Sequence, residues 1–393
     1  MPRPDLFERL ARAHAQCARQ DLLRRVRTIE QVDGPRISVN GRALLNFASN
    51  DYLGLAQHPA LREALCTAAA RRGVGATAAH LLGGHRDEHD ALEQKLARWT
   101  GRERALLFST GYMANLGVLG ALLQTGDVCV QDKLNHACLL DGARLSGAEL
   151  RRYRHADVAS AKQQLELRPG AAAMLASDGV FSMDGDIAPL TALAALCKTQ
   201  RATLMVDDAH GVGVLGANGA GAGAELGQDD VPILMATLGK ALGVAGAFVA
   251  GSAALIDGLV QFARTYIYTT ALPPALAAAA SAAVDIARDD HERRARLRLR
   301  IAQFRAGAAA QGITLLPSAS AIQPVLIGAS DVALAAARQL ETAGFYVPAI
   351  RPPTVPAGKA RLRVTLSAAH EESDVAGLLD ALALSVPRPR GTA

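Results

Sequence analysis

The sequence predicts an α/β protein whose larger part is a doubly wound, mainly parallel sheet. Short apolar runs alternate with longer helical segments, which is typical of repeated strand–helix units. The runs are too short for helices, and several end directly in polar residues, as strands do in open α/β sheets that bind ligands beyond their carboxyl ends. These predicted strands are residues 105–108, 128–130, 173–176, 203–206 and 233–236. A further strand at 246–250 is predicted to run antiparallel where the chain turns back.

The N-terminal part precedes this alternation. Residues 5–27 carry apolar side chains at helical spacing with arginines between them, which predicts one amphipathic helix. Turn sequences on both sides of residues 36–39 predict a β-hairpin. Small polar and aromatic residues without a clean period follow at 46–55 and predict an ordered loop that could belong to a site.

A helix is predicted over residues 58–72, and a second helix is predicted to begin near His89. The segment from His85 to His89 matches the H-x-x-E-H zinc-protease pattern. The sequence specifies no third ligand, so a polar helical turn is the preferred interpretation and no metal site is predicted.

The C-terminal part reads as a second, smaller α/β domain entered through one long helix, 275–311. Its predicted strands are 322–327, 346–350 and 360–366, and its predicted helices are 331–343 and 372–385. We therefore expect an N-terminal helix and hairpin (1–49), a large domain (50–286) and a C-terminal small domain (287–393).

Composition limits the function classes. Half of the 393 residues are hydrophobic and the net charge is only +5, as in a soluble enzyme. The arginine-rich segment 291–300 has no interleaved aromatic residues, which favours a solvated helix face over a nucleic-acid site and leaves an acidic partner such as acyl carrier protein open. Five scattered cysteines without a C-x-x-C pair, and no apolar leader or membrane span, predict a cytoplasmic protein.

The chemistry gathers in residues 204–243. One predicted strand ends in Asp207, with His210 just beyond it, and the next strand leads to Thr237 and Lys240. An acid, an imidazole, a hydroxyl and a lysine at one sheet edge suit pyridoxal phosphate, because the lysine can form a Schiff base while the carboxylate keeps the pyridine nitrogen protonated. A helix cap and a solvated lysine are the structural alternative, but lysine is rare here and only Lys240 lies among glycines and apolar residues.

Two further turns bear on this interpretation. Residues 109–113 join a strand to a helix through a glycine, which makes either an ordinary capped turn or an anion site at a helix N-terminus. His136 follows another strand, as a core residue or as a flat ring beside a cofactor. Residues 211–216 match G-x-G-x-x-G, but no helix is predicted to open there, so a nicotinamide-dependent oxidoreductase is the weaker alternative.

Taken together, these motifs resemble the α-oxoamine synthases, fold-type-I pyridoxal-phosphate enzymes that condense an amino acid with an acyl thioester and release carbon dioxide. The resemblance covers nearly the whole chain and rests on residues 50–55, 108–112, 180–185, 206–211 and 237–240. Residues 352–358 with the following Arg361-Leu362-Arg363 are most similar to the member that uses L-alanine and a pimeloyl thioester, carried by CoA or acyl carrier protein, in biotin synthesis. Glycine C-acetyltransferase, 5-aminolevulinate synthase and a non-enzymatic regulator of this fold remain alternatives.

The resemblance implies a role for individual residues. The cofactor would be held by Gly111, Tyr112, His136, Ser182, Asp207, His210, Thr237 and Lys240, among which Lys240, Asp207, His210 and His136 would serve catalysis. Asn50 and Arg363 would bind the carboxylate of the amino acid, and Arg24 and Thr354 would contact substrate. Family members are homodimers with the site at the interface.

The chain departs from the family pattern at two places. The glycine-rich loop, commonly Gly-Ser-Gly-Gly-Ser, reads Gly75-Ala76-Thr77-Ala78-Ala79 here, which leaves its backbone less free. Asp178 stands where glutamate is frequent, so a shorter acid serves there.

Overall fold

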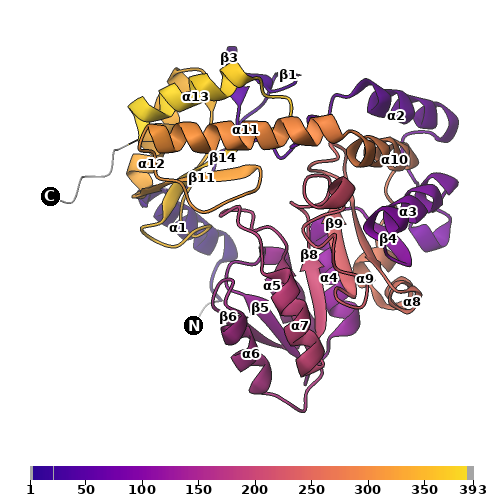
Figure 1. Ribbon diagram of the computed structural model, residues 1–393. Coiled ribbons are helices and arrows are strands. Elements are labelled where there is room, and N and C mark those ends of the chain that lie inside the picture. The colour runs from indigo at the N-terminus through magenta and orange to yellow at the C-terminus, as the bar shows by residue number, and fades with distance from the viewer. Residues whose placement is uncertain (1–2, 21, 387–393) are drawn as a thin grey trace.

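The computed structural model describes residues 3–20 and 22–386 and confirms the doubly wound sheet (Figure 1). Seven strands lie in the order β4-β10-β9-β8-β7-β5-β6. Only β10 is antiparallel to its neighbours, as predicted for the turn-back strand. The strands are β4 (Arg104–Phe108), β5 (Val128–Asp132), β6 (Glu149–Tyr153), β7 (Ala173–Asp178), β8 (Thr203–Asp207), β9 (Ile233–Thr237) and β10 (Ala247–Gly251).

Helices cover both faces of this sheet, because successive side chains of a buried strand point to opposite sides. In β4, for example, Leu106 packs in the cluster on one face and Leu107 in the cluster on the other. The first face is covered by α4 (Gly111–Leu122), α5 (Ala137–Ser146), α8 (Ala253–Phe262) and α9 (Arg264–Ile267). The second is covered by α3 (Asp87–Thr100), α6 (Val158–Glu166), α7 (Leu190–Gln200) and α10 (Pro274–Asp289), with α2 (Pro59–Arg72) against α10.

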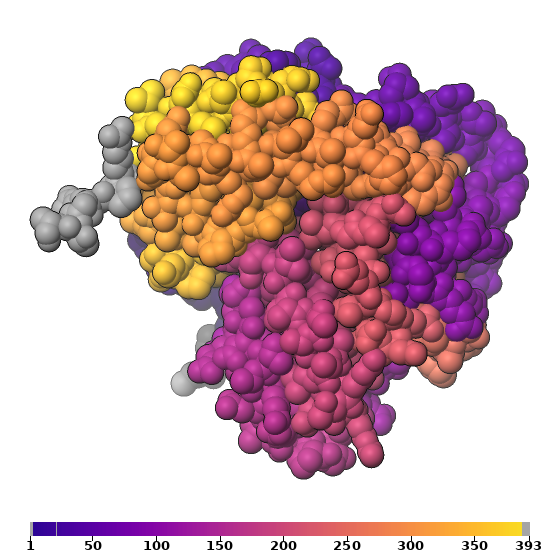
Figure 2. Space-filling model, in the orientation of Figure 1, coloured from indigo at the N-terminus to yellow at the C-terminus, as the bar shows by residue number. Residues whose placement is uncertain are grey.

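The C-terminal part packs three helices on an antiparallel sheet. In the space-filling view its orange-to-yellow surface adjoins the magenta surface of the large domain (Figure 2). The helices are α11 (His291–Ala310), α12 (Ser330–Thr342) and α13 (Glu372–Ser385), and the strands are β11 (Ile322–Gly328), β14 (Ala360–Thr365) and β13 (Ala349–Ile350).

The N-terminal strands join this C-terminal part. They are β1 (Gln31–Asp33), β2 (Arg36–Val39) and β3 (Arg42–Asn46), and β3 pairs in parallel with β12 (Phe345–Tyr346). We therefore propose that these strands belong to the C-terminal domain and do not form a separate N-terminal unit.

Three predicted elements need correction. The N-terminal helix, α1 (Leu6–Arg19), buries none of its residues, so periodicity without tertiary packing does not carry it on to residue 27. The predicted helix 275–311 is two helices, because the Asp290 side chain accepts a hydrogen bond from the Arg293 amide and caps α11. The predicted strand 346–350 is divided between β12 and β13, which belong to different sheets. Among the described helices, none is long and apolar enough to cross a membrane.

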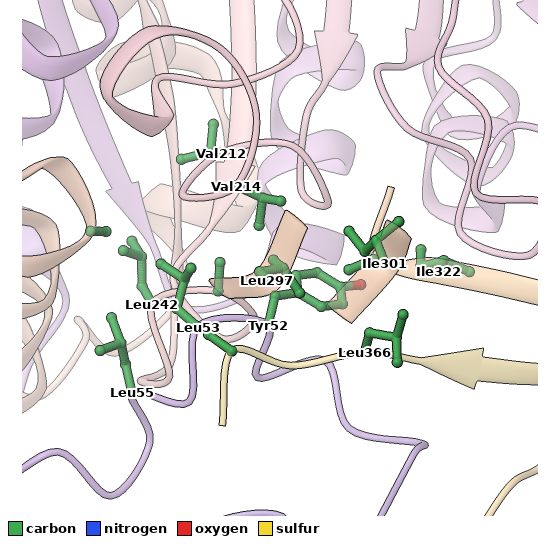
Figure 3. Close-up of a cluster of buried hydrophobic side chains, with 14 of the residues drawn as sticks. Tyr52, Leu53, Leu55, Val212, Val214, Leu242, Leu297, Ile301, Ile322 and Leu366 are labelled. Atoms are coloured by element: carbon green, nitrogen blue, oxygen red, sulfur yellow. The ribbon is translucent and has the colours of Figure 1, made fainter. Parts of the chain in front are cut away.

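The predicted loop at 46–55 lies where the two parts of the molecule meet (Figure 3). Tyr52, Leu53 and Leu55 are all almost completely buried, and they share one apolar cluster with Leu297 and Ile301 of α11. This packing fixes the loop, so the polar residues within it are held in a defined place beside the large sheet.

Candidate active site

Two carboxylates lie side by side at the carboxyl edge of the large sheet. Asp178 ends β7, Asp207 ends β8, and the two residues pair directly in the sheet register. Asp207 Oδ2 accepts a hydrogen bond of 2.7 Å from Asn115 Nδ2, and its Oδ1 accepts one of 3.1 Å from the Ala209 amide. Asn115 was not anticipated from the sequence. An asparagine inside the apolar segment of α4 is the signal that could have found it, because a buried amide needs a polar partner.

Lys240 follows β9 and lies close enough to this pair of acids for their charges to act on its ammonium group. Burial lowers the pKa of its ammonium group, and the nearby charges of Asp207 and Asp178 only partly oppose that effect. A larger fraction of the amine is therefore neutral near pH 7 than for a solvated lysine. A neutral amine can attack a carbonyl carbon or take up a proton, which are the two properties that Schiff-base chemistry requires.

His210 is held by Tyr52, a residue of the loop at 46–55. The Tyr52 hydroxyl lies 2.6 Å from His210 Nδ1 and 3.2 Å from Asn50 Oδ1. Burial raises the pKa of Tyr52 to about 12, so this hydroxyl stays protonated. Burial, with the charges of Lys240 and Arg363, holds the pKa of His210 well below its usual value, so the imidazole is neutral.

Arg363 joins segments that lie far apart in the sequence. Its Nε donates to the Ser182 carbonyl oxygen at 2.7 Å, and its Nη2 donates to Asn50 Oδ1 at 3.2 Å. A third bond of 3.0 Å runs from Nη1 to Thr365 Oγ1. The structure thus brings Asn50, Ser182 and Arg363 together, as a shared role at one site requires.

The start of α4 offers unused backbone donors. Thr110 caps this helix by accepting a hydrogen bond of 3.2 Å from the Met113 amide. Within the described residues, the amides of Gly111 and Tyr112 have no protein acceptor, so they can bind an anion at the positive end of the helix. The Thr237 hydroxyl, expected at a phosphate, donates to the Gly246 carbonyl at 3.0 Å and accepts from the Gly239 amide at 3.2 Å.

His136 lies at the entrance of a cavity. It caps α5, and its own amide donates to Asp178 Oδ2 at 3.0 Å, which shows that the shorter acid at position 178 reaches this turn. The imidazole is exposed and lines a cavity of about 760 Å³ together with Ser182 and Thr354. Cys138 Sγ lies 2.7 Å from His136 Nδ1.

Arg24 is a predicted site residue that the structure does not join to this cluster. It lies exposed in the irregular segment after α1 and makes no hydrogen bond or ion pair with another described residue. Thr77, in the unusual loop, has φ of +63°, so the left-handed backbone conformation that suits glycine is occupied by a β-branched residue.

Two further sequence motifs have defined surroundings in the structure. At the H-x-x-E-H segment, His80 joins His85 and His89, and one ring nitrogen of each lies within 4.8 Å of the others. Glu88 of the H-x-x-E-H pattern forms ion pairs with Arg71 and Arg72. His89 Nδ1 accepts a hydrogen bond from the Arg86 amide, and His89 Nε2 donates one to the Leu272 carbonyl oxygen. Residues 211–216 form turns, not a helix, and wrap the buried Asp208. That segment therefore lacks the helix N-terminus that a dinucleotide site uses.

The chain is similar to known enzymes over nearly its whole length. A profile of the class I and II aminotransferase family matches residues 42–382. The 8-amino-7-oxononanoate synthase of Methylococcus capsulatus is 55% identical over 96% of this chain and 98% of its own length. Among solved structures, the enzyme of that name from Francisella tularensis is 32% identical with a TM-score of 0.76, covering 87% of this chain and 97% of that one. A serine palmitoyltransferase from S. paucimobilis with bound PLP and myriocin is 29% identical with a TM-score of 0.92, covering 97% and 98%.

Proposed function

Because this chain belongs to the 8-amino-7-oxononanoate synthase family, we propose that the site around Lys240 condenses L-alanine with a pimeloyl thioester and releases carbon dioxide. The chain is a pyridoxal-phosphate-dependent acyltransferase of biotin biosynthesis. The observation that supports this assignment of the site best is the convergence of Lys240, Asp207, His210 and Arg363 beside one sheet edge.

The residues present fit the cofactor. Lys240 would form the Schiff base, and Asp207, held in place by Asn115, would face the pyridine nitrogen. The free amides at Gly111 and Tyr112 would bind the phosphate, with Thr237 shaping the turn that leads to Lys240. His210 and Ser182 would contact the ring oxygen, and His136 would cover the ring face.

Bound pyridoxal phosphate supplies a ring that withdraws electrons from the amino-acid Cα. Lys240, whose lowered pKa makes the neutral amine available, acts as the general base that removes the Cα proton and later returns one. Asn50 and Arg363 hold the carboxylate of alanine, which fixes the direction of the Cα–H bond toward Lys240. The neutral His210, kept in place by Tyr52, donates or accepts one hydrogen bond without adding charge.

Several finer features are part of the same proposal. Thr354 would contact the substrate at the cavity, where it is already exposed, and Arg24 would do so if it approaches from a second subunit. We propose a homodimer in the cytoplasm, in keeping with five cysteines that are all free in the structure. The acyl group would arrive on CoA or on acyl carrier protein.

A competition assay tests the substrates. Holoenzyme receives equal concentrations of alanine and glycine with pimeloyl-, acetyl- or succinyl-CoA, and the products are quantified by mass spectrometry. We expect alanine to be preferred over glycine, and pimeloyl over both shorter donors. Faster turnover of glycine with acetyl-CoA or succinyl-CoA would mean that the chain is instead a glycine C-acetyltransferase or a 5-aminolevulinate synthase.

A further inference from the structure

Two of the chain's six lysines line one cavity and have no ion-pair partner among the residues that the structure describes. Three others form ion pairs on the surface, namely Lys95, Lys162 and Lys198, and Lys240 belongs to the cofactor site. The remaining two, Lys133 and Lys359, both line the 760 Å³ cavity beside His136. Their ammonium groups make no hydrogen bond or ion pair with any described residue. Most lysine side chains are separate from one another on the protein surface, so two lysines in one cavity need an explanation.

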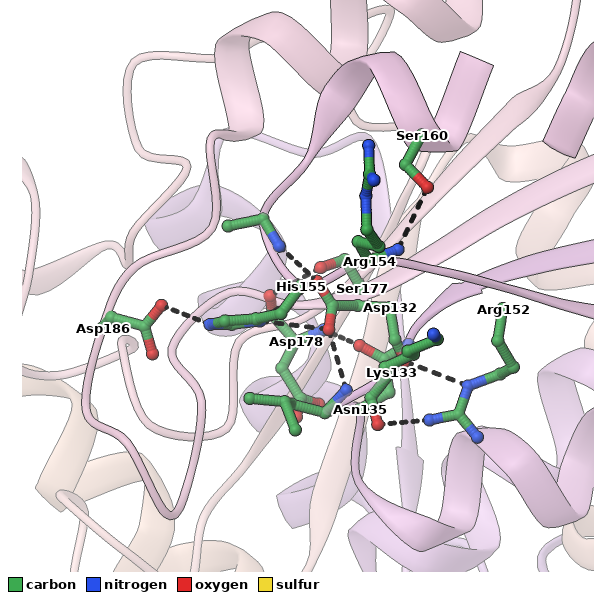
Figure 4. A network of polar contacts seen from close by, with 12 residues as sticks. Asp132, Lys133, Asn135, Arg152, Arg154, His155, Ser160, Ser177, Asp178 and Asp186 are labelled. Atoms are coloured by element: carbon green, nitrogen blue, oxygen red, sulfur yellow. Dashed lines mark hydrogen bonds and ion pairs between the residues drawn. The ribbon is translucent and has the colours of Figure 1, made fainter. Parts of the chain in front are cut away.

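A third cation reinforces them. Arg152 reaches the same cavity, and its guanidinium donates to the backbone carbonyl oxygens of Asp132 and Lys133, not to a carboxylate (Figure 4). The nearby Asp132 carboxylate is occupied by His155, whose Nδ1 lies 3.1 Å away. Burial lowers the pKa of Arg152, and the charge of Asp132 opposes that effect.

The acids of the cavity do not balance these charges. The one carboxylate in its lining, Asp184, forms an ion pair of 2.6 Å with Arg361. Among the described residues, Lys133, Arg152 and Lys359 therefore have no carboxylate partner. The excess positive charge of these three side chains favours the binding of an anionic ligand in the cavity.

The rest of the lining is apolar and leads to the reaction centre. Leu140, Met183, Leu316 and Val355 contribute apolar surface. His136 and Ser182, which we place against the cofactor, line the same cavity. A ligand that fills it would have an apolar stretch, an anionic group some distance from Lys240, and a reacting end near His136.

We propose that this cavity receives the acyl thioester donor and that Lys133, Arg152 and Lys359 bind an anionic group of that donor. The inference rests on the proposed function, since it is that reaction which calls for a thioester donor. The anion has two sources, the carboxylate at the far end of the acyl chain and the phosphates of the carrier. Both are oxyanions that lysine and arginine bind through charge-assisted hydrogen bonds.

Calorimetric binding of pimeloyl-CoA to the holoenzyme tests the inference without requiring turnover. The double variant Lys133→Ala with Lys359→Ala should weaken binding by about tenfold or more, because it removes two of the three cations that would bind the anionic group of the donor. The matched control is Lys162→Ala, an exposed lysine paired with Glu166 on α6. The conservative double variant Lys133→Arg with Lys359→Arg should restore most of the affinity, which a folding defect would not explain.

Two shortened donors identify the source of the anion. Heptanoyl-CoA lacks the far carboxylate, and the N-acetylcysteamine thioester of pimelate lacks the phosphates. If the lysines bind the carboxylate, the alanine variant loses affinity only for the donors that carry it; if they bind phosphate, it loses affinity only for the CoA donors. Either pattern supports the inference.

Unchanged affinity of the alanine double variant for pimeloyl-CoA, or no binding of pimeloyl-CoA to the wild type, would overturn the inference. Failure of the proposed function gives a different result, namely a wild-type holoenzyme that forms no ketone product from alanine and pimeloyl-CoA. The two failures are therefore read from separate measurements.

Discussion

The carboxyl edge of the sheet and the neighbouring cavity share His136 but differ in how their polar groups are satisfied. At the edge, Asp207 is bonded to Asn115, His210 to Tyr52, and Arg363 to Ser182. In the cavity, Lys133 and Lys359 have no partner in the described chain.

This difference separates two kinds of site. Groups that must keep one geometry throughout a reaction are fixed in advance by the protein, because a preorganised site does not need to reorganise during the chemistry. Groups that only bind a charged substrate can remain solvated until it arrives. We therefore expect substitutions at the edge to affect turnover strongly and substitutions in the cavity to affect mainly the affinity for the donor.

The largest effect is expected at Lys240. Lys240→Ala removes the nucleophile and the base together, so turnover should fall by several orders of magnitude and covalent attachment of the cofactor should disappear. The wild type should be yellow, and borohydride reduction followed by mass mapping should place the cofactor on Lys240. A label on any other lysine, Lys133 or Lys359 included, would contradict the division between edge and cavity.

The next effect separates two adjacent acids. Asp207→Asn should keep the fold and lose most turnover, since each unit by which the ring nitrogen's pKa falls costs about 1.4 kcal/mol. Asp208→Asn is the matched control, because burial raises the pKa of Asp208 to about 8 and its side chain is already mostly neutral at pH 7. Stopped-flow absorbance with alanine measures both variants. Equal losses in the two would show that Asp207 has no special role.

A smaller effect is expected at Tyr52. Tyr52→Phe removes the hydroxyl that lies 2.6 Å from His210 Nδ1 and leaves a buried nitrogen without its partner, at a cost of about 1–3 kcal/mol. We expect turnover to fall by about tenfold to a hundredfold while the KM for the acyl donor changes little. Tyr346→Phe, far along the chain and half-buried, serves as the control. A rise in the donor KM with unchanged kcat would contradict this prediction, because it would show that Tyr52 acts in donor binding and not in the chemistry at the sheet edge.

The last prediction concerns Asp208, whose substitution should have the smallest effect on turnover and should instead change how the stability of the fold depends on pH. The pKa of Asp208 is raised from 3.8 to about 8, so between these values the folded protein holds a proton that the unfolded chain releases. Asp208 therefore makes the folded state less stable as the pH rises from about 4 to 8. Asp208→Asn should flatten this part of the stability curve, as measured by urea unfolding at several pH values. An unchanged slope would show that Asp208 is ionised in the folded protein.

Much of the fold was predictable because it depends on local pattern. Short apolar runs with polar ends predicted six of the seven strands of the large sheet but missed β6 (Glu149–Tyr153), whose residues are largely charged. The position of β10 as the antiparallel strand followed from where the chain turns back. The predictions at 5–27, 275–311 and 346–350 were wrong in extent. The length of α1 depended on its lack of tertiary packing, and the break in the long helix depended on the cap at Asp290. The division of strand 346–350 depended on which sheet each part joins. Hydrophobic periodicity carries no information on these three features.

By itself, the sequence determined the strand–helix alternation, the placement of Asp207, His210 and Lys240 near strand ends, and the family resemblance that names their roles. Only the tertiary structure decided which distant side chains contact them, namely Asn115 and Tyr52, and which cations line the neighbouring cavity. The physical reason is that strand periodicity is a property of neighbouring residues, whereas a hydrogen bond such as that from Asn115 to Asp207 joins residues 92 positions apart. The same holds for Lys133 and Lys359, which lie far apart in the sequence and line one cavity only because the fold brings them together.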